Sequence, residues 1–347
     1  MDEVEAEQEV QGEGVFETEC LTLHPNGDAV LVVPGRNASP TKEFLVSSGV
    51  LSVASDYFKS LFSPDFNEGS ETQRGNRPRI PLEGDDPEAM QVILSILYFQ
   101  NHTRYEALEP RELAAIAVQT DKYDCARALK PWISVWLAVD GNQTAEDLGL
   151  LLSAAYFFRA PGALKQISSL AIRKVGFDIV SSWPNQEITS LLPPELTATV
   201  DDRIQLLLSR LHGILQAGEE SLQGNSRGFE MTGRMCLQCG RRHPETAKKC
   251  HPCSNNVLYP EYCTSQSRVC EYFSIMRQKG LWPSVVPFKR LAAADLAKQL
   301  ELAACDCRHT CKASHCPLRV ELESISRTVN RTVQHVKGIT FEDFSSA

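Results

Sequence analysis

The stretch FLVSSGVLSVASDYFKSLFSPDF, residues 44–66, decides the fold of the front half of this chain. Phe44 and Val46 suit an extended strand. From Ser47 onward the apolar residues recur at spacings of three and four, which is typical of one helix face. These residues are Val50, Leu51, Ala54, Phe58, Leu61 and Phe62. Ser55 interrupts the pattern as a cap, so we predict a strand followed by two short helices, with most large side chains facing inward.

The segments on either side of this stretch supply the rest of a small sheet. Ala29–Val33 is a short continuous apolar run between turn signals, as expected of a buried strand, and Thr41–Val46 is predicted to pair with it as a hairpin. The polar segment Asn67–Arg77 is predicted to be a loop. Arg79–Leu82 predicts a short edge strand, and Asp86-Pro87 predicts a helix start.

In this order, the residues resemble the signature of the BTB/POZ domain over roughly residues 20–140. The matching positions are Asp28, Phe44, Val46, Ser47-Ser48, Val50-Leu51, Ser55 and Tyr57-Phe58. The chain departs from the pattern at Ser47, where most animal members carry a histidine. A second segment, DKYDCARALKPWISVWL at Asp121–Leu137, resembles the end of this domain in filamentous-fungal proteins.

The resemblance implies an α+β domain, a small sheet flanked by helices, that works by binding other proteins. Members of the family form homomeric or heteromeric contacts, and some link targets to cullin-type ubiquitin ligases. It therefore implies protein partners for this chain, with a cullin among the candidates. It also implies a homodimer, which we expect to be weak because the acidic N-terminal residues would repel their own copy.

Composition divides the 347 residues into unlike parts. The first 19 residues hold eight acids and no base, too charged to bury a core. Ten of the 12 cysteines lie between Cys236 and Cys316. We predict a disordered acidic tail at 1–19, a BTB/POZ-like domain at 20–140, an all-helical extension at 141–217, a Gly/Ser-rich linker at 218–233, a cysteine-rich zinc module at 234–320, and a C-terminal helix and tail at 321–347.

The sharpest chemical signal is the spacing Cys236-x2-Cys239-x10-Cys250-x2-Cys253. Each CxxC pair can offer two thiolates from one tight turn, and two pairs supply the four sulfurs of a tetrahedral zinc site. Free thiols and disulfides are the alternatives for these cysteines, and a reducing compartment argues against the disulfides. We therefore predict one structural Zn²⁺ here, in a module similar to a zinc ribbon.

A second zinc site is predicted from Cys305, Cys307, Cys311 and Cys316, with lower specificity. His309 and His315 lie among these cysteines, and Cys263 and Cys270 lie upstream. The candidate ligands outnumber the four that zinc needs. The ligand set of this second site therefore stays open.

Residues 231–320 carry 14 Lys and Arg against six Asp and Glu, a net charge of +8. This leaves a nucleic-acid-binding regulator as an alternative to a protein-interaction adaptor, although the basic residues are scattered with little aromatic interleaving.

No catalytic motif appears in the chain, so we predict that it is not an enzyme. The acid pair Asp85-Asp86 is explained by capping at a helix start. No basic region followed by an apolar run marks a secretory signal, and no apolar run approaches the ~20 residues of a membrane span. We therefore expect a location in the cytoplasm or nucleus.

Overall fold

The structure, a computed structural model, describes residues 18–35, 40–100, 103–176, 180, 183, 187–225, 231–282, 291–305 and 316–344. The chain forms two compact units, with a division that falls within helices α7 and α8. Unit 1 comprises the described residues up to Ala138 together with Ser153–Ala163, and unit 2 comprises the others. The tail predicted at 1–19 lies outside the described residues except for its last two.

A four-stranded sheet organises unit 1. Its strands are β1 (Thr18–Thr22), β2 (Ala29–Val33), β3 (Thr41–Val46) and β4 (Arg79–Pro81), in the order β1-β3-β2-β4. The predicted hairpin is confirmed, since β2 and β3 are antiparallel with Ala29 opposite Val46. Strand β4 is parallel to β2 and lies at one edge of the sheet. An edge position is expected because Pro81 has no N–H to donate to a second neighbouring strand. Alternate residues of β2 and β3 are buried, which places the core on one face.

Strand β1 starts at Thr18, inside the segment predicted to be a disordered tail. Glu19 on this strand forms an ion pair with Lys42 on β3. The side chain of Lys42 on β3 is 4% exposed, and its ammonium lies 3.6 Å from the carboxylate of Glu19 and 2.5 Å from that of Glu88 on α4. A buried charge is costly unless it is paired. These two carboxylates, with the amide oxygen of Gln91, compensate the lysine and tie β1 to β3 and α4.

Six α-helices complete this part of unit 1. Their bounds are α1 (Ser48–Ala54), α2 (Asp56–Leu61), α3 (Asn67–Gln73), α4 (Pro87–Leu97), α5 (Pro110–Lys122) and α6 (Ala126–Trp136), with a 3-10 turn η1 at Thr103–Glu106. The predicted caps are confirmed at two starts. The hydroxyl of Ser55 accepts from the N–H of Phe58, and the carboxylate of Asp86 accepts from the N–H of Ala89.

The prediction of a loop at Asn67–Arg77 was wrong for its first seven residues, which form α3. The helix packs closely on the preceding turn at a glycine: a Cβ on Gly69 would lie 2.0 Å from the carbonyl oxygen of Ser63. The hydroxyl of Ser70 also donates to the carbonyl of Pro64. Polar composition hid this helix, because its contact with the protein is made by backbone and a glycine rather than by an apolar stripe.

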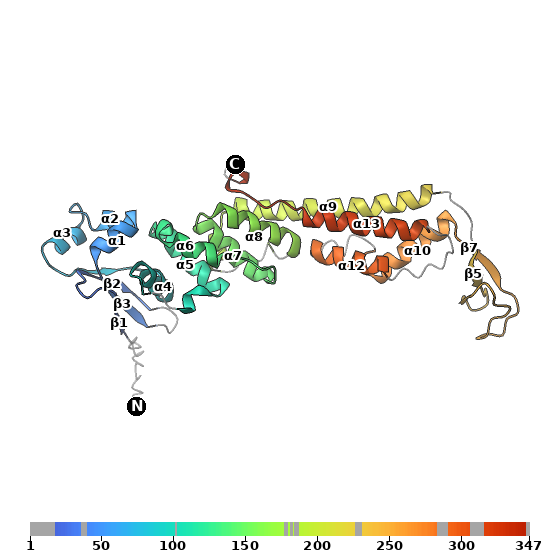
Figure 1. Ribbon diagram of the computed structural model, residues 1–347, viewed down its shortest axis with the longest axis horizontal. Helices are drawn as coiled ribbons and strands as arrows, with labels where there is room; N and C mark the ends of the chain where they lie inside the picture. The colour runs from blue at the N-terminus through green and yellow to red at the C-terminus, as the bar shows by residue number, and fades with distance from the viewer. Residues whose placement is uncertain are drawn as a thin grey trace, which may run out of the picture. The chain divides into compact units, whose positions relative to one another are not determined.

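Unit 2 is mainly helical. Its elements include α7 (Ala145–Phe157) and α8 (Pro161–Lys174), which begin and end in different units, the 3-10 turn η3 (Thr189–Leu191), α9 (Pro194–Gly224), α10 (Ser265–Gln278), α12 (Ala293–Cys305), α13 (Pro317–Gln334) and η4 (Phe341–Asp343). Helices α9 and α13 run side by side, with α10 and α12 packed against them (Figure 1). The predicted helical region is therefore confirmed, and it continues well beyond residue 217.

The linker predicted at 218–233 is helical over its first seven residues, which complete α9. Gly218 allows Ile325 of α13 to approach, since a Cβ there would lie 2.3 Å from the Ile325 side chain. The hydroxyl of Ser221 donates to the carboxylate of Glu321 at 2.8 Å, and Leu222 is buried. Packing on α13 thus overrides the poor helix propensity of a Gly- and Ser-containing segment.

Helix α13 starts at Pro317, four residues before the predicted C-terminal segment. The residues after it are held against α8. The N–H of Ile339 donates to the hydroxyl of Ser168 at 2.7 Å, and a Cβ on Gly338 would lie 1.7 Å from the carbonyl oxygen of Lys165. Within the described part of the chain, no helix has the length and apolarity that crossing a bilayer demands.

Candidate metal centre and interaction surface

The four cysteines of the first predicted site belong to a small three-stranded sheet in unit 2. Strand β5 (Met231–Met235) lies at its centre, with β6 (Arg242–His243) and β7 (Tyr259–Tyr262) antiparallel to it on either side. The first cysteine pair lies in the turn between β5 and β6, and the second lies in the segment between β6 and β7. The sheet therefore brings together two turns that are 14 residues apart in sequence.

The two turns have the same local geometry. The N–H of Cys236 donates to the carbonyl of Arg241, and the N–H of Cys250 donates to the carbonyl of Asn255, each five residues further along. The residue after each second cysteine adopts a left-handed conformation, Gly240 at φ 68° and Ser254 at φ 58°. A serine is strained there where glycine is not. This repeated turn aims both thiols of a pair to one side.

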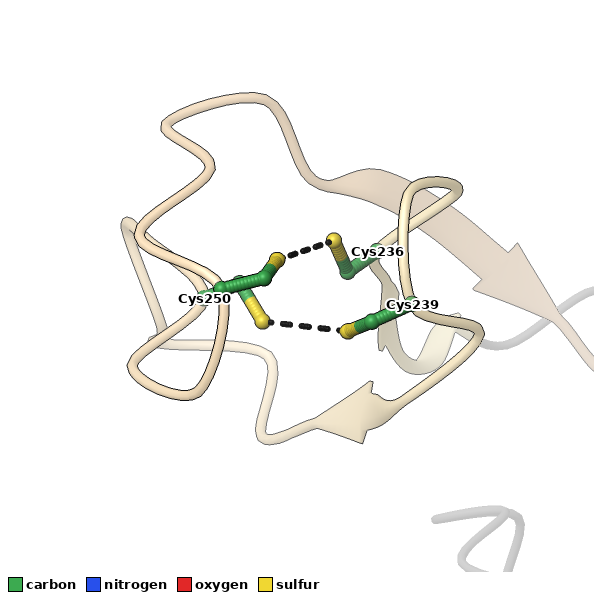
Figure 2. Close-up of side chains that lie close together, drawn as sticks. Cys236, Cys239 and Cys250 are labelled. Atoms are coloured by element: carbon green, nitrogen blue, oxygen red, sulfur yellow. Dashed lines mark hydrogen bonds between the residues drawn. The ribbon is translucent and has the colours of Figure 1, made fainter.

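The four sulfurs lie within 4.8 Å of one another, and Figure 2 shows Cys236, Cys239 and Cys250 pointing toward a common centre. The Sγ atoms of Cys236 and Cys253 are 3.5 Å apart, and those of Cys239 and Cys250 are 3.4 Å apart. Both separations far exceed the ~2.05 Å of a disulfide bond. Four sulfurs at about 2.3 Å from one zinc ion form a tetrahedron with edges of about 3.8 Å. The cluster could therefore hold one metal ion.

The environment of the thiols favours ionisation at one of them first. Burial raises the pKa of Cys236, but hydrogen bonds from the N–H of Cys239, the Cys253 thiol and the N–H of Gln238 outweigh it and lower the pKa to about 6. Burial instead raises the pKa of Cys250 to about 12. Four adjacent thiolates would repel one another strongly, so full ionisation of the cluster needs a cation at its centre.

The apolar core around these turns is very small. Cys236 and Cys250 are fully buried beside Leu258, which is 9% exposed, and Ala247 and Cys253 pack against them. A single leucine and two thiols contribute little of the buried area that normally stabilises a domain. The apolar core alone therefore gives this small sheet little stability.

Of the four cysteines of the second predicted site, the described residues include only the first and the last. Cys305 is exposed at the last position of α12, and Cys316 is buried at the cap of α13. Cys307, Cys311, His309 and His315 lie outside the described residues. Of the upstream cysteines, Cys263 is buried and accepts a hydrogen bond from the guanidinium of Arg268 at 3.1 Å, and Cys270 is exposed. Neither belongs to the first cluster, and this second ligand set stays a prediction.

A different kind of feature lies on consecutive helices of unit 1. Val53 on α1 is 80% exposed, Tyr57 on α2 is 42% exposed, and Phe66 at the start of α3 is 50% exposed. The expectation that most large side chains of residues 44–66 face inward is confirmed for the predicted helix face, none of whose residues is exposed, and these three side chains lie outside that face. Helical periodicity found the buried face correctly, but it gave no signal that three apolar side chains remain outside.

Comparison with family models matches residues 24–128 to the BTB/POZ domain. These residues form a BTB/POZ domain. Comparison with curated proteins finds no match for the chain. The match begins at His24, so strand β1 precedes it, and it ends inside α6.

The signature residues of the BTB/POZ domain have identifiable structural roles. The carboxylate of Asp28 accepts hydrogen bonds from the N–H and the hydroxyl of Ser48, both at 2.7 Å, and so holds the start of α1. Phe58 stacks on Tyr123, with ring centroids 5.0 Å apart. The hydroxyl of Ser55 donates to the carbonyl of Tyr123 at 2.5 Å. One aromatic residue near the end of α5 therefore anchors both short helices.

Asp85 was predicted to be part of a helix cap, and that prediction was wrong. Asp86 alone caps α4, while Asp85 is 2% exposed and lies 2.6 Å from the ammonium of Lys122. The hydroxyl of Tyr123 donates to the other oxygen of the same carboxylate. Burial, followed by this carboxylate, raises the pKa of Tyr123. The acid joins the start of α4 to the end of α5, a role that depends on tertiary contact and has no local sequence signal.

Cys125 is a packing residue of the BTB/POZ domain. It is fully buried and its thiol contacts the carbonyl of Thr120. Burial raises the pKa of its thiol to about 12, which leaves it protonated and unreactive at neutral pH.

Proposed function

We propose that this chain is a non-enzymatic adaptor that binds another protein through its BTB/POZ domain. The observation that supports this most is the exposure of Val53, Tyr57 and Phe66 on α1–α3 of that domain. We take these three side chains as the contact surface, because a set of exposed large apolar residues marks an interaction site more often than a single exposed one does. The BTB/POZ match supports a general role in binding other proteins, and these three side chains are the surface that we propose for that binding.

The four-cysteine cluster contributes a structural Zn²⁺ in this proposal. Zinc takes four thiolates in tetrahedral geometry and leaves no open position for a substrate. Cys236, Cys239, Cys250 and Cys253 satisfy that requirement from two equivalent turns. The ion supplies cross-linking of the small sheet, and the surrounding N–H groups orient the sulfurs. In this proposal, the zinc ion keeps the sheet β5–β7 rigid, so that its surface has a fixed shape.

A cullin is the specific partner that the family resemblance suggests for the BTB/POZ domain. We expect the purified N-terminal region of a cullin to bind the intact chain, and Phe66→Ser to weaken that binding by about tenfold or more, as for an apolar anchor at an interface. Calorimetric titration measures this. Val135→Asp is the matched control, since Val135 is 58% exposed on α6, away from α1–α3 in sequence. Equal binding by wild type and the Phe66 variant would exclude this surface as the cullin site.

The nucleic-acid alternative receives less support from the described part of the basic module. The guanidinium of Arg242 lies 3.2 Å from the carboxylate of Glu261 and 3.5 Å from that of Glu271, so part of the positive charge is neutralised internally. Four thiolates around zinc offset more of it. DNA binding that falls steeply with salt would favour this alternative over the adaptor.

Self-association is a further part of the proposal, at low affinity. Strand β1 is an edge strand, paired on one side with β3, and one free strand edge can pair with a copy. The acidic residues just before it oppose such pairing. We expect a dimer that buries less than ~1,200 Å² and dissociates on dilution in light scattering. Deleting residues 1–17 should tighten it, and strict monomers for both chains at high concentration would contradict this.

A further inference from the structure

A pocket of about 300 Å³ lies in unit 2 beside α9, far in sequence from the BTB/POZ domain and the cysteine cluster. One wall is a single stripe of α9: Arg203, Leu206, Leu207 and Arg210, at spacings of three, four and seven. Residues at these spacings share one helix face. Leu207 is buried and forms part of an apolar floor with Ile172 of α8 and Val336.

The end of α13 and the residues after it supply a second part of the lining, which is also basic. His335 and Lys337 line the pocket there, beside the hydroxyl-bearing Thr332. Contacts with α8 hold the backbone of these residues in place. The carbonyl of Val336 accepts from the hydroxyl of Ser169 at 2.9 Å, and the neighbouring Gly338 is packed against α8. The backbone that presents Lys337 is therefore fixed rather than loose.

The charges around this pocket are unbalanced. Four of its nine lining residues are basic, and none is acidic. Of the four, Arg203 alone forms an ion pair with another residue of the described chain, 3.3 Å from Asp343. The side chains of Arg210 and Lys337 contact no described carboxylate, and the Nδ1 atom of His335 lies 2.8 Å from the carbonyl of Arg331. Positively charged side chains from two separate elements thus line one pocket. They repel one another unless an anion lies between them.

We propose that this pocket binds a phosphate monoester carried on an apolar group. Two guanidinium groups and an ammonium supply charge-assisted donors that suit the phosphate oxygens. Leu206, Leu207 and Val336 accommodate the apolar carrier. The carrier is either the phosphorylated side chain of a peptide or a free organic phosphate. The pocket lies outside the surface proposed for the adaptor role, so the two proposals stand or fall separately.

The test is calorimetric titration of the intact chain with phenyl phosphate, inorganic phosphate and benzyl alcohol as probes. We expect phenyl phosphate to bind more tightly than inorganic phosphate, because it also fills the apolar floor, and benzyl alcohol not to bind. The double substitution Arg210→Gln with Lys337→Gln should weaken phenyl phosphate binding by about tenfold or more, since each lost contact is a charge-assisted hydrogen bond.

Arg319→Gln with Lys298→Gln is the matched control, because these exposed residues of α13 and α12 change the net charge equally and lie outside the pocket. Circular dichroism confirms that each variant is folded. A phosphotyrosine peptide, compared with its unphosphorylated form, separates the two sources of the phosphate. Absence of phenyl phosphate binding, or equal weakening by the control pair, would overturn the proposal.

Discussion

Replacing Cys236 with serine should remove one bound zinc ion from the chain and unfold residues 231–262. A structural zinc contributes roughly 10–16 kcal/mol to the folding of a small module, and the apolar core here is little more than Leu258 between two cysteines. No other stabilising element of comparable size is present among the described residues of this sheet. Elemental analysis measures the zinc, and hydrogen exchange of peptides from 231–262 measures the unfolding.

Cys20→Ser is the matched control for this experiment. Cys20 is an exposed cysteine on β1, outside the cluster, and its loss should change neither zinc content nor exchange at 231–262. Removal of zinc from the wild-type chain by a chelator should reproduce the effect of Cys236→Ser on exchange. If that variant keeps as much zinc as the wild type, the cluster is not a zinc site.

Phe58→Ala should destabilise the BTB/POZ domain by about 2–5 kcal/mol, the usual cost of truncating a buried aromatic residue. The Phe58 ring stacks on Tyr123 at an interplanar angle of 6° and on Phe62 at a centroid distance of 6.3 Å. Tyr123 in turn forms hydrogen bonds with Ser55 and Asp85. The cavity left by the Phe58 ring would therefore weaken the packing of α2, α4 and α5 together. Urea dependence of hydrogen exchange at peptides from α4 and α5 measures the loss in the intact chain.

Phe66→Ala gives the comparison for Phe58, because it removes the same ring eight residues later at a position that is 50% exposed. Substitutions at exposed sites usually stay within about 0.5 kcal/mol. The two variants should therefore differ strongly in the urea midpoint of α4 and α5. Equal midpoints for Phe58→Ala and the wild type would show that the stacked ring does not support the domain.

The sequence was most informative where a local rule decides the structure. Ser55 and Asp86 cap their helices as expected because a side chain and a nearby N–H are sufficient for a cap. A continuous apolar run and the turn signals around it located β2 and its hairpin partner β3 to the residue. The spacing of Cys236, Cys239, Cys250 and Cys253 predicted a cluster that the fold does bring together.

The sequence was least informative where distant contacts decide. Asp85 looks like a cap residue, yet Lys122 and Tyr123, 37 and 38 residues away, make it a buried partner. Helix α9 continues through a Gly- and Ser-containing segment because α13, a hundred residues later, packs on Gly218 and Ser221. The exposed Val53, Tyr57 and Phe66 lie within the stretch 44–66, and only the fold shows which of its apolar residues are left uncovered.

The adaptor role itself is tested most directly by quantitative affinity capture with the intact chain as bait. The double variant Val53→Asp with Phe66→Ser is compared with the wild type and with Val135→Asp, whose substituted residue is exposed elsewhere on the same unit. We predict a defined set of proteins that is captured by the wild type and by Val135→Asp and is lost with the double variant. Capture of the same proteins in the same amounts by all three baits would contradict the proposed interaction surface.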